Sequence, residues 1–175
     1  MPLAAAIWLY FASGWRPGGG AEHGELIDPP RLLPETPLAR ADGGAASADV
    51  LKNAWMLVFV EDEACAERCR AALVDMRQAR LALDKDAGRV KRVLLHAGDC
   101  CESGFGADEP DLLVLAAAGP AGAELRALFP PAAGGGRGIY IVDPHGNLMM
   151  SYPASGAASG IFKDLERLLR LSHIG

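Results

Sequence analysis

Two apolar segments separated by an amphipathic one constrain the fold of this chain more than any other feature. The runs WMLVFV (55–60) and VKRVLLH (90–96) are short, continuous and rich in β-forming residues, which is typical of strands buried on both faces of a sheet. Between them, small and apolar residues recur every three or four positions and predict a helix over about 66–83. Its buried stripe consists of Cys69, Leu73, Met76, Ala79 and Leu83. Because such crossovers are right-handed, the two strands should be parallel neighbours.

The second half of the chain adds the remaining elements of one α/β domain. The segment 111–117 fits either a strand or the start of a helix, and its pattern does not separate the two. The other predicted elements are a helix over 121–129, a hairpin of strands 138–144 and 147–153, and a helix over 159–171. Strand, helix, strand, helix, hairpin, helix is the order of the thioredoxin fold. We therefore expect a central mixed sheet flanked by helices over residues 50–175.

The N-terminal part of the chain differs in composition from this domain. Residues 1–15 carry no charged side chain, and Trp8, Tyr10 and Trp15 fit an interfacial aromatic belt, which favours a membrane anchor or its remnant. A signal peptide and a buried or peripheral helix are the alternatives. Residues 16–49 are rich in Gly, Pro and charge and predict an extended linker. We expect a single-pass protein of a bacterial inner membrane whose domain faces the periplasm.

The charge of the chain excludes nucleic acid as a partner. With 17 Lys and Arg against 22 Asp and Glu, the formal net charge is −5, and no basic cluster marks a nucleic-acid surface. Four cysteines are also too few for a disulfide-dense secreted module. Their arrangement, Cys65 with Cys69 and Cys100 beside Cys101, indicates local chemistry instead.

The motif Cys65-Ala-Glu-Arg-Cys69 stands where the first buried strand ends and its helix begins. Open α/β sheets present their ligands outside the carboxyl ends of their strands, and a helix N-terminus favours a thiolate. In a regular helix the two Cβ atoms would lie roughly 5–6 Å apart, whereas a disulfide needs about 3.8 Å. A bridge therefore requires Cys65 to precede the first turn. Two converging thiolates also suit Cu(I), and two buried core cysteines are the third interpretation.

Three further positions carry candidate chemistry. His96 ends the second buried strand near the same sheet edge as Cys65, and His145 lies in the hairpin turn. Either is a strand-end or turn residue, or a metal ligand. The vicinal pair Cys100/Cys101 is a second metal site, a resolving pair for Cys65/Cys69, or an incidental oxidisable pair. The acidic run 61–63 predicts a solvated loop.

Several segments resemble the Sco/SenC proteins, thioredoxin-like factors that help mature the copper sites of cytochrome c oxidase. WMLVFVEDEACAERCRAALVDMRQ (55–78) resembles their active-site segment, ADGGAASADVLKNAW (41–55) the strand and turn before it, and GIYIVDPHGNLMMSYP (138–153) their hairpin. The tail FKDLERLL (162–169) is similar to that of a divergent bacterial branch found with cytochrome oxidase genes. The likeness covers about residues 26–174.

This resemblance implies a membrane-tethered periplasmic accessory factor that presents Cys65 and Cys69 for copper delivery or for thiol reduction at a copper site. Its partner would be a cytochrome c oxidase subunit or another copper-site assembly protein. The family adds a histidine just before the hairpin, and that place falls on 134–137, where this chain has Gly-Gly-Gly-Arg. His96 or His145 then remain as third ligands. There are two alternatives. One is a periplasmic thiol–disulfide oxidoreductase, which would be an enzyme, and the other is a binding module without redox or metal activity.

Overall fold

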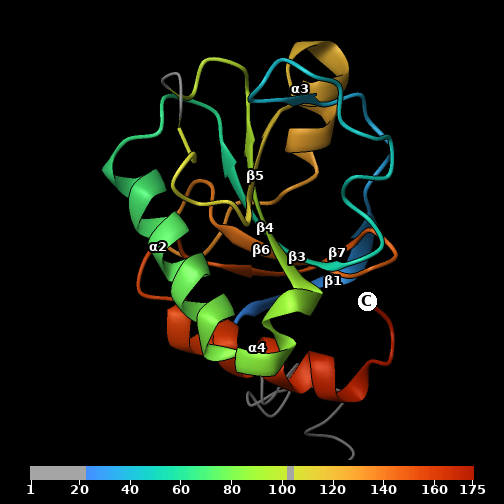
Figure 1. The fold of residues 1–175 in the computed structure, drawn as a ribbon, viewed down its shortest axis with the longest axis vertical. Helices are drawn as coiled ribbons and strands as arrows, with labels where there is room; N and C mark the ends of the chain where they lie inside the picture. The colour runs from blue at the N-terminus through green and yellow to red at the C-terminus, as the bar shows by residue number, and fades with distance from the viewer. Residues whose placement is uncertain (1–22, 102–104) are drawn as a thin grey trace, which may run out of the picture.

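A computed structural model of the chain describes residues 23–101 and 105–175, and a seven-stranded mixed sheet forms its centre (Figure 1). The strand order is β1-β7-β6-β3-β4-β5-β2. β3, β4 and β5 run parallel, whereas β6, β7, β1 and β2 each pair antiparallel with their neighbours. The strands are β1 (Glu25–Leu32), β2 (Ala39–Arg40), β3 (Trp55–Glu61), β4 (Val90–His96), β5 (Leu112–Ala116), β6 (Ile139–Val142) and β7 (Asn147–Tyr152).

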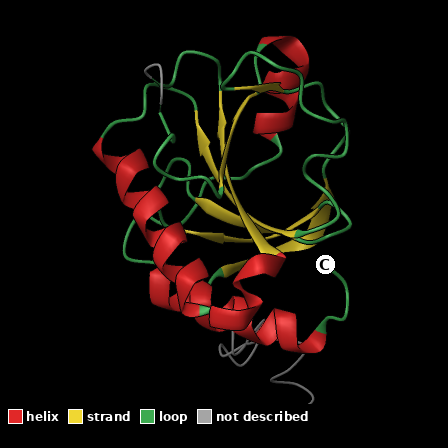
Figure 2. Ribbon diagram, viewed as in Figure 1, coloured by secondary structure: helices red, strands yellow, loops and turns green. Residues whose placement is uncertain are grey.

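Helices cover both faces of this sheet (Figure 2). α2 (Glu67–Ala82) and α4 (Ala158–Leu171) pack against each other on one face, and α3 (Gly119–Ala127) lies on the other. A 3₁₀ turn, η1 (Asp84–Arg89), links α2 to β4. β3 lies between the two helical layers, so apolar residues are buried on both of its faces. Leu57 and Phe59 enter the core under α2 and α4, and Met56 and Val58 enter the core under α3.

The structure confirms the predicted order of elements from β3 onward. α2 and α4 begin and end within one residue of the predicted helices, and the predicted hairpin is β6 and β7 with the turn 143–146 between them. The ambiguous segment 111–117 is the strand β5. α3 starts at Gly119, two residues earlier than expected, because the chain turns into the helix with Gly119 at a φ of +70° and Pro120 follows in the first turn.

The domain begins earlier in the sequence than residue 50, which corrects the predicted boundary. β1 and β2 lie within the segment expected to be a linker, and they extend the sheet at its two edges. β1 pairs with β7, and only Ile27 of its residues is buried. The proposed anchor, residues 1–15, lies outside the described residues. Among the residues that are described, no helix combines the length and apolar character that a bilayer crossing requires.

A buried carboxylate fastens the start of this N-terminal segment to the last helix. Asp164 of α4 is 3% exposed and accepts hydrogen bonds from the backbone N–H groups of His23 and Gly24 and from the Tyr152 hydroxyl, the last at 2.7 Å. Burial, together with the Asp164 carboxylate, raises the pKa of Tyr152, so its hydroxyl remains a donor. The Asp164 side chain thus joins three segments that are distant in the sequence: the start of the N-terminal segment, β7 and α4.

Replacing Asp164 should therefore loosen the N-terminal segment and destabilise the domain. In Asp164→Ala the buried Tyr152 hydroxyl and two backbone N–H groups lose their acceptor, and we expect the free energy of unfolding to fall by about 1–3 kcal/mol. Urea unfolding measures this change. Glu166→Ala, at an exposed position of the same helix, is the matched control and should leave stability unchanged. Equal effects of the two variants would contradict this account of Asp164.

Candidate functional site

Cys65 and Cys69 form a disulfide at the carboxyl end of β3. Cys65 precedes Ala66, the N-cap of α2, and Cys69 is the third residue of the helix. Their Cα atoms lie 5.1 Å apart, within the usual range for a disulfide. The sequence expectation that a bridge needs Cys65 ahead of the first turn is met. The prediction that both cysteines lie at this strand-to-helix junction is confirmed.

The two sulfur positions differ in access. Cys69 is fully buried in the core under α2 and α4, whereas Cys65 retains 8% of its surface exposed. The N-cap residue of α2, Ala66, makes no side-chain hydrogen bond to the first turn of the helix. A nucleophile from a partner would therefore reach the sulfur of Cys65 first.

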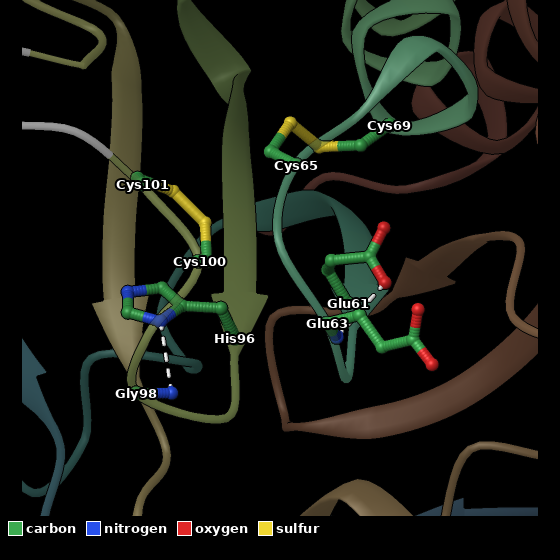
Figure 3. Close-up of a disulfide and its surroundings, with 8 residues drawn as sticks. All are labelled: Glu61, Glu63, Cys65, Cys69, His96, Gly98, Cys100 and Cys101. Carbon is green, nitrogen blue, oxygen red and sulfur yellow. Dashed lines mark hydrogen bonds between the residues drawn. A yellow bond between two sulfur atoms is a disulfide. The ribbon is translucent and has the colours of Figure 1, made fainter.

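A second disulfide, Cys100–Cys101, lies beside the first (Figure 3). The Cys65 N–H donates a hydrogen bond of 2.9 Å to the carbonyl of Cys100. The parallel register of β3 and β4, which pairs Glu61 with His96, explains this proximity, because both strands end at the same edge of the sheet. In Figure 3 the acidic loop after β3 turns back on itself, and the Glu63 N–H donates to the Glu61 carboxylate.

The two candidate histidines lie at opposite ends of the sheet. His96 ends β4 on the side of the cysteines, is 7% exposed, and accepts a hydrogen bond at Nδ1 from the Gly98 N–H. Burial and the charge of Arg126 lower the pKa of His96 below its ordinary value, with Asp99 opposing. His145 follows β6, whose last residue Val142 pairs with Met56 at the start of β3. That placement separates His145 from Cys65 by the length of the strand and argues against it as a third ligand.

The segment 134–137 contacts the helix that carries Cys69. Arg68, within the cysteine motif, donates hydrogen bonds to the carbonyls of Gly135 and Arg137. The loop in which the resemblance places a histidine thus contacts the helix that carries Cys69. It presents carbonyl groups to a guanidinium in place of an imidazole. Nothing in the sequence pattern indicated this contact of Arg68.

Asp62 is exposed, as the prediction of a solvated acidic loop requires, and it also joins the cysteine loop to two other segments. Its carboxylate forms ion pairs with Arg126 of α3 and with Arg137, the latter at 2.7 Å. Partial burial raises the pKa of Asp62, but the hydrogen bonds and charges of Arg137 and Arg126 outweigh it and hold the pKa below its ordinary value. Arg137 also donates to the carbonyls of Arg126 and Phe129, so the loop before β6 is fixed against the site.

The donor set at this end of the sheet fits one oxidation state of copper better than the other. Reduced Cys65 and Cys69 would offer two soft thiolates, which suit Cu(I). Cu(II) prefers nitrogen and oxygen ligands, and 134–137 contributes no histidine. Within the described ranges, no three His, Cys, Asp or Glu side chains gather as a metal site would require.

A dithiol at the end of the first central strand, with a crossover helix behind it and a hairpin and terminal helix after it, defines a thioredoxin-like protein. The family described as "Transmembrane-like, thioredoxin-like, C-terminal domain" matches residues 55–172, and the chain belongs to that family. A comparison with curated proteins gives no match.

Solved structures of Sco proteins share this fold. Copper-bound ScoI of Bradyrhizobium japonicum is 18% identical with a TM-score of 0.60, and the match covers 78% of this chain and 99% of that one. Apo Sco1 of Thermus thermophilus is 18% identical with a TM-score of 0.64, over 84% and 96% of the chains. BsSco, described as having a disulfide switch and as a member of the Sco family of cytochrome c oxidase assembly proteins, is 18% identical with a TM-score of 0.58, over 85% and 100%. The expected Sco/SenC likeness is confirmed at the level of the fold.

The Asp62 ion pairs should give the domain a specific pH dependence. A carboxylate whose folded pKa is depressed contributes stability above its unfolded pKa, near the ordinary value of 3.8, and loses it as the pH falls through the folded value. Wild type should therefore be more stable than Asp62→Asn at neutral pH, and the difference should vanish at acid pH. Urea unfolding over a pH series measures it. Glu63→Gln is the control, and a difference that persists unchanged below pH 3 would contradict the ion-pair account.

Proposed function

We propose that this chain is an accessory factor in cytochrome c oxidase assembly whose Cys65/Cys69 dithiol reduces the disulfide of a copper-site partner. The observation that carries the proposal is the Cys65–Cys69 bridge at the carboxyl end of β3, next to a loop that Arg68 holds and that contains no histidine. A pair that closes within one strand-to-helix junction can alternate between dithiol and disulfide without moving the elements around it. The fold shared with Sco proteins supports the class of partner.

The chemistry is a thiol–disulfide exchange whose atoms balance between the two proteins. The Cys65 thiolate attacks one sulfur of the partner disulfide, which breaks, and a mixed disulfide forms. Cys69 then attacks the Cys65 sulfur, the Cys65–Cys69 bridge closes, and the partner leaves as two thiols. Two electrons and two protons pass from this chain to the partner. The thiolate, and not the thiol, is the form of Cys65 that begins the exchange.

Copper delivery is the second candidate, and the chemistry of the two sulfur atoms favours it. The reduced pair would hold Cu(I) as cargo through two thiolates from one helix start. A general periplasmic oxidoreductase and a binding module that does not use its cysteines are further alternatives. We also propose that residues 1–15 tether the domain to the inner membrane with its site in the periplasm, because that run is uncharged and carries interfacial aromatic residues.

The difference in access between the two cysteines predicts which variant traps a partner. Both variants are made in a chain that also carries Cys100→Ser and Cys101→Ser. There, Cys69→Ser leaves the more exposed Cys65 to form a mixed disulfide that cannot be resolved, whereas Cys65→Ser leaves only the fully buried Cys69. Each reduced variant is mixed with the oxidised copper-binding domain of a cytochrome c oxidase subunit, and the adduct is quantified by mass spectrometry. Adduct from Cys69→Ser alone is the expected result. Equal yields, or none from either variant, would exclude Cys65 as the attacking thiol.

Copper binding separates the second candidate from the first. In a chain carrying Cys100→Ser and Cys101→Ser, anaerobic titration of the reduced protein against a competing chelator should give about one bound Cu(I) if Cys65 and Cys69 are ligands. Adding Cys65→Ser and Cys69→Ser should abolish this binding. Cu(II) should bind weakly, because the nitrogen ligand is missing at 134–137. Absence of Cu(I) binding removes delivery and leaves thiol reduction.

A histidine in the loop before β6 should strengthen Cu(II) binding. A Cβ at Gly135 meets no atom within 4 Å, and the φ of +84° costs a histidine about 1 kcal/mol. Gly134→His is the matched control, because its φ of +86° and its open surroundings are nearly the same. We expect tighter Cu(II) binding in Gly135→His than in Gly134→His by equilibrium titration. Tight Cu(II) binding by the unmodified chain that is lost in His96→Ala would show that His96 is the third ligand instead.

A further inference from the structure

The vicinal pair Cys100/Cys101 has no part in the chemistry proposed so far. Cys100 is 6% exposed and belongs to the same apolar core as Cys65 and Cys69. Cys101 packs against that core from its edge and is only partly buried. All four cysteine side chains therefore lie in or against one cluster, and they differ in how far each is exposed at the surface.

A backbone contact holds the two pairs together. The Cys65 N–H and the Cys100 carbonyl are joined by a hydrogen bond of 2.9 Å, and the loops that carry them leave parallel neighbouring strands at the same edge. The close-up shows both bridges above His96, the residue that ends β4 (Figure 3). The pairing of β3 with β4 therefore places the two cysteine pairs at one edge of the sheet.

Cys101 also borders a pocket that the first pair does not reach. The pocket has a volume of about 610 Å³, and its wall includes Arg40, His96, Cys101, Phe105 and Leu115. Cys65 and Cys69 are not among its lining residues. A protein thiol or disulfide that entered this pocket would meet Cys101 first.

We propose that Cys100–Cys101 is a second redox centre that exchanges directly with Cys65–Cys69, and that Cys101 gives a protein thiol or disulfide partner access to it from the pocket. The inference rests on the proposed redox role of Cys65/Cys69 and adds a second point of access to it. The domain then carries two dithiol/disulfide couples, one beside α2 and one beside the pocket. Two electrons pass between these couples.

The internal exchange needs no external oxidant or reductant. With Cys65 and Cys69 reduced, the Cys65 thiolate attacks a sulfur of the vicinal bridge, that S–S bond breaks, and one of the two vicinal cysteines leaves as a thiolate. Cys69 then attacks the Cys65 sulfur, which closes the first bridge and frees the second vicinal thiol. Two electrons and two protons have moved from one pair to the other. A protein dithiol that enters the pocket can first reduce the vicinal bridge. The internal steps then run in reverse, and the vicinal dithiol reduces Cys65–Cys69.

Pairs of single cysteines test whether the two centres reach each other. The full-length variants Cys69→Ser/Cys101→Ser and Cys69→Ser/Cys100→Ser each keep Cys65 and one vicinal cysteine. Both are reduced, oxidised at low protein concentration, and mapped by peptide mass spectrometry, with circular dichroism to verify the fold. We expect at least one of them to lose both free thiols to an intramolecular bridge. Two free thiols in both variants, or bridges between molecules only, would overturn the proposal.

Cys65→Ser/Cys101→Ser is the matched control, because it keeps Cys100 with the fully buried Cys69. It should retain both thiols under the same oxidation. Bridging in this control equal to that of the Cys65 variants would contradict the assignment of Cys65 as the exchanging thiol and overturn the proposed route.

The wild-type chain provides a second measurement if a variant fails to fold. Partly reduced wild type is quenched with acid and alkylated, and its cross-linked peptides are mapped. A bridge from Cys65 to Cys100 or Cys101 supports the proposal, and local bridges alone at every degree of reduction overturn it. These readouts follow only the internal exchange, so they stand apart from the trapping experiment with a copper-site domain.

Discussion

The parallel pairing of β3 with β4 is the constraint on which the rest of the structure depends. Both strands bury apolar side chains on their two faces, because α2 and α4 cover one side and α3 the other. The register that pairs Glu61 with His96 brings the loops after both strands to one edge. Each of those loops carries a cysteine pair, and the hydrogen bond between Cys65 and Cys100 follows from this arrangement.

Charged side chains fix the surroundings of the dithiol while the cysteines themselves remain in the core. Asp62 ties the loop after β3 to α3 and to the segment before β6 through Arg126 and Arg137. Arg68 holds the same segment from the side of α2. These contacts place carbonyl groups of the segment before β6 and the guanidinium groups of Arg68, Arg126 and Arg137 around the loop that carries the dithiol. Segment 134–137 contributes no histidine there, so this environment offers little to Cu(II).

The sequence was most informative where apolar residues form a run or a repeat. Continuous apolar runs predict β3 and β4, and apolar residues recurring every three or four positions predict α2. A bridge requires Cys65 ahead of the helix, and the structure places it there. β1 and β2 escaped prediction because they are edge strands. β1 contains Pro29 and Pro30 and buries only Ile27, and β2 has two exposed residues, so neither shows an alternating pattern.

Contacts between loops were predictable only in part. Parallel strands end at one edge, so the approach of Cys100 to Cys65 could have been anticipated from β3 and β4. The partners of Asp62 and Arg68 could not, because they depend on the path of the irregular segment 130–138, for which no periodicity exists. The burial of Asp164 beneath the N-terminal segment is similar: a polar residue on a helix face reveals its partners only when the distant chain is in place.

The reduction potential of the Cys65–Cys69 couple tests the central claim most directly. It is measured in the full chain carrying Cys100→Ser and Cys101→Ser, by equilibration in thiol–disulfide buffers followed by alkylation and mass analysis. A redox function predicts a reversible two-electron transition between roughly −120 and −270 mV, where exchanging protein disulfides lie. A bridge that stays oxidised in buffers below about −300 mV, as structural disulfides do, would contradict the account.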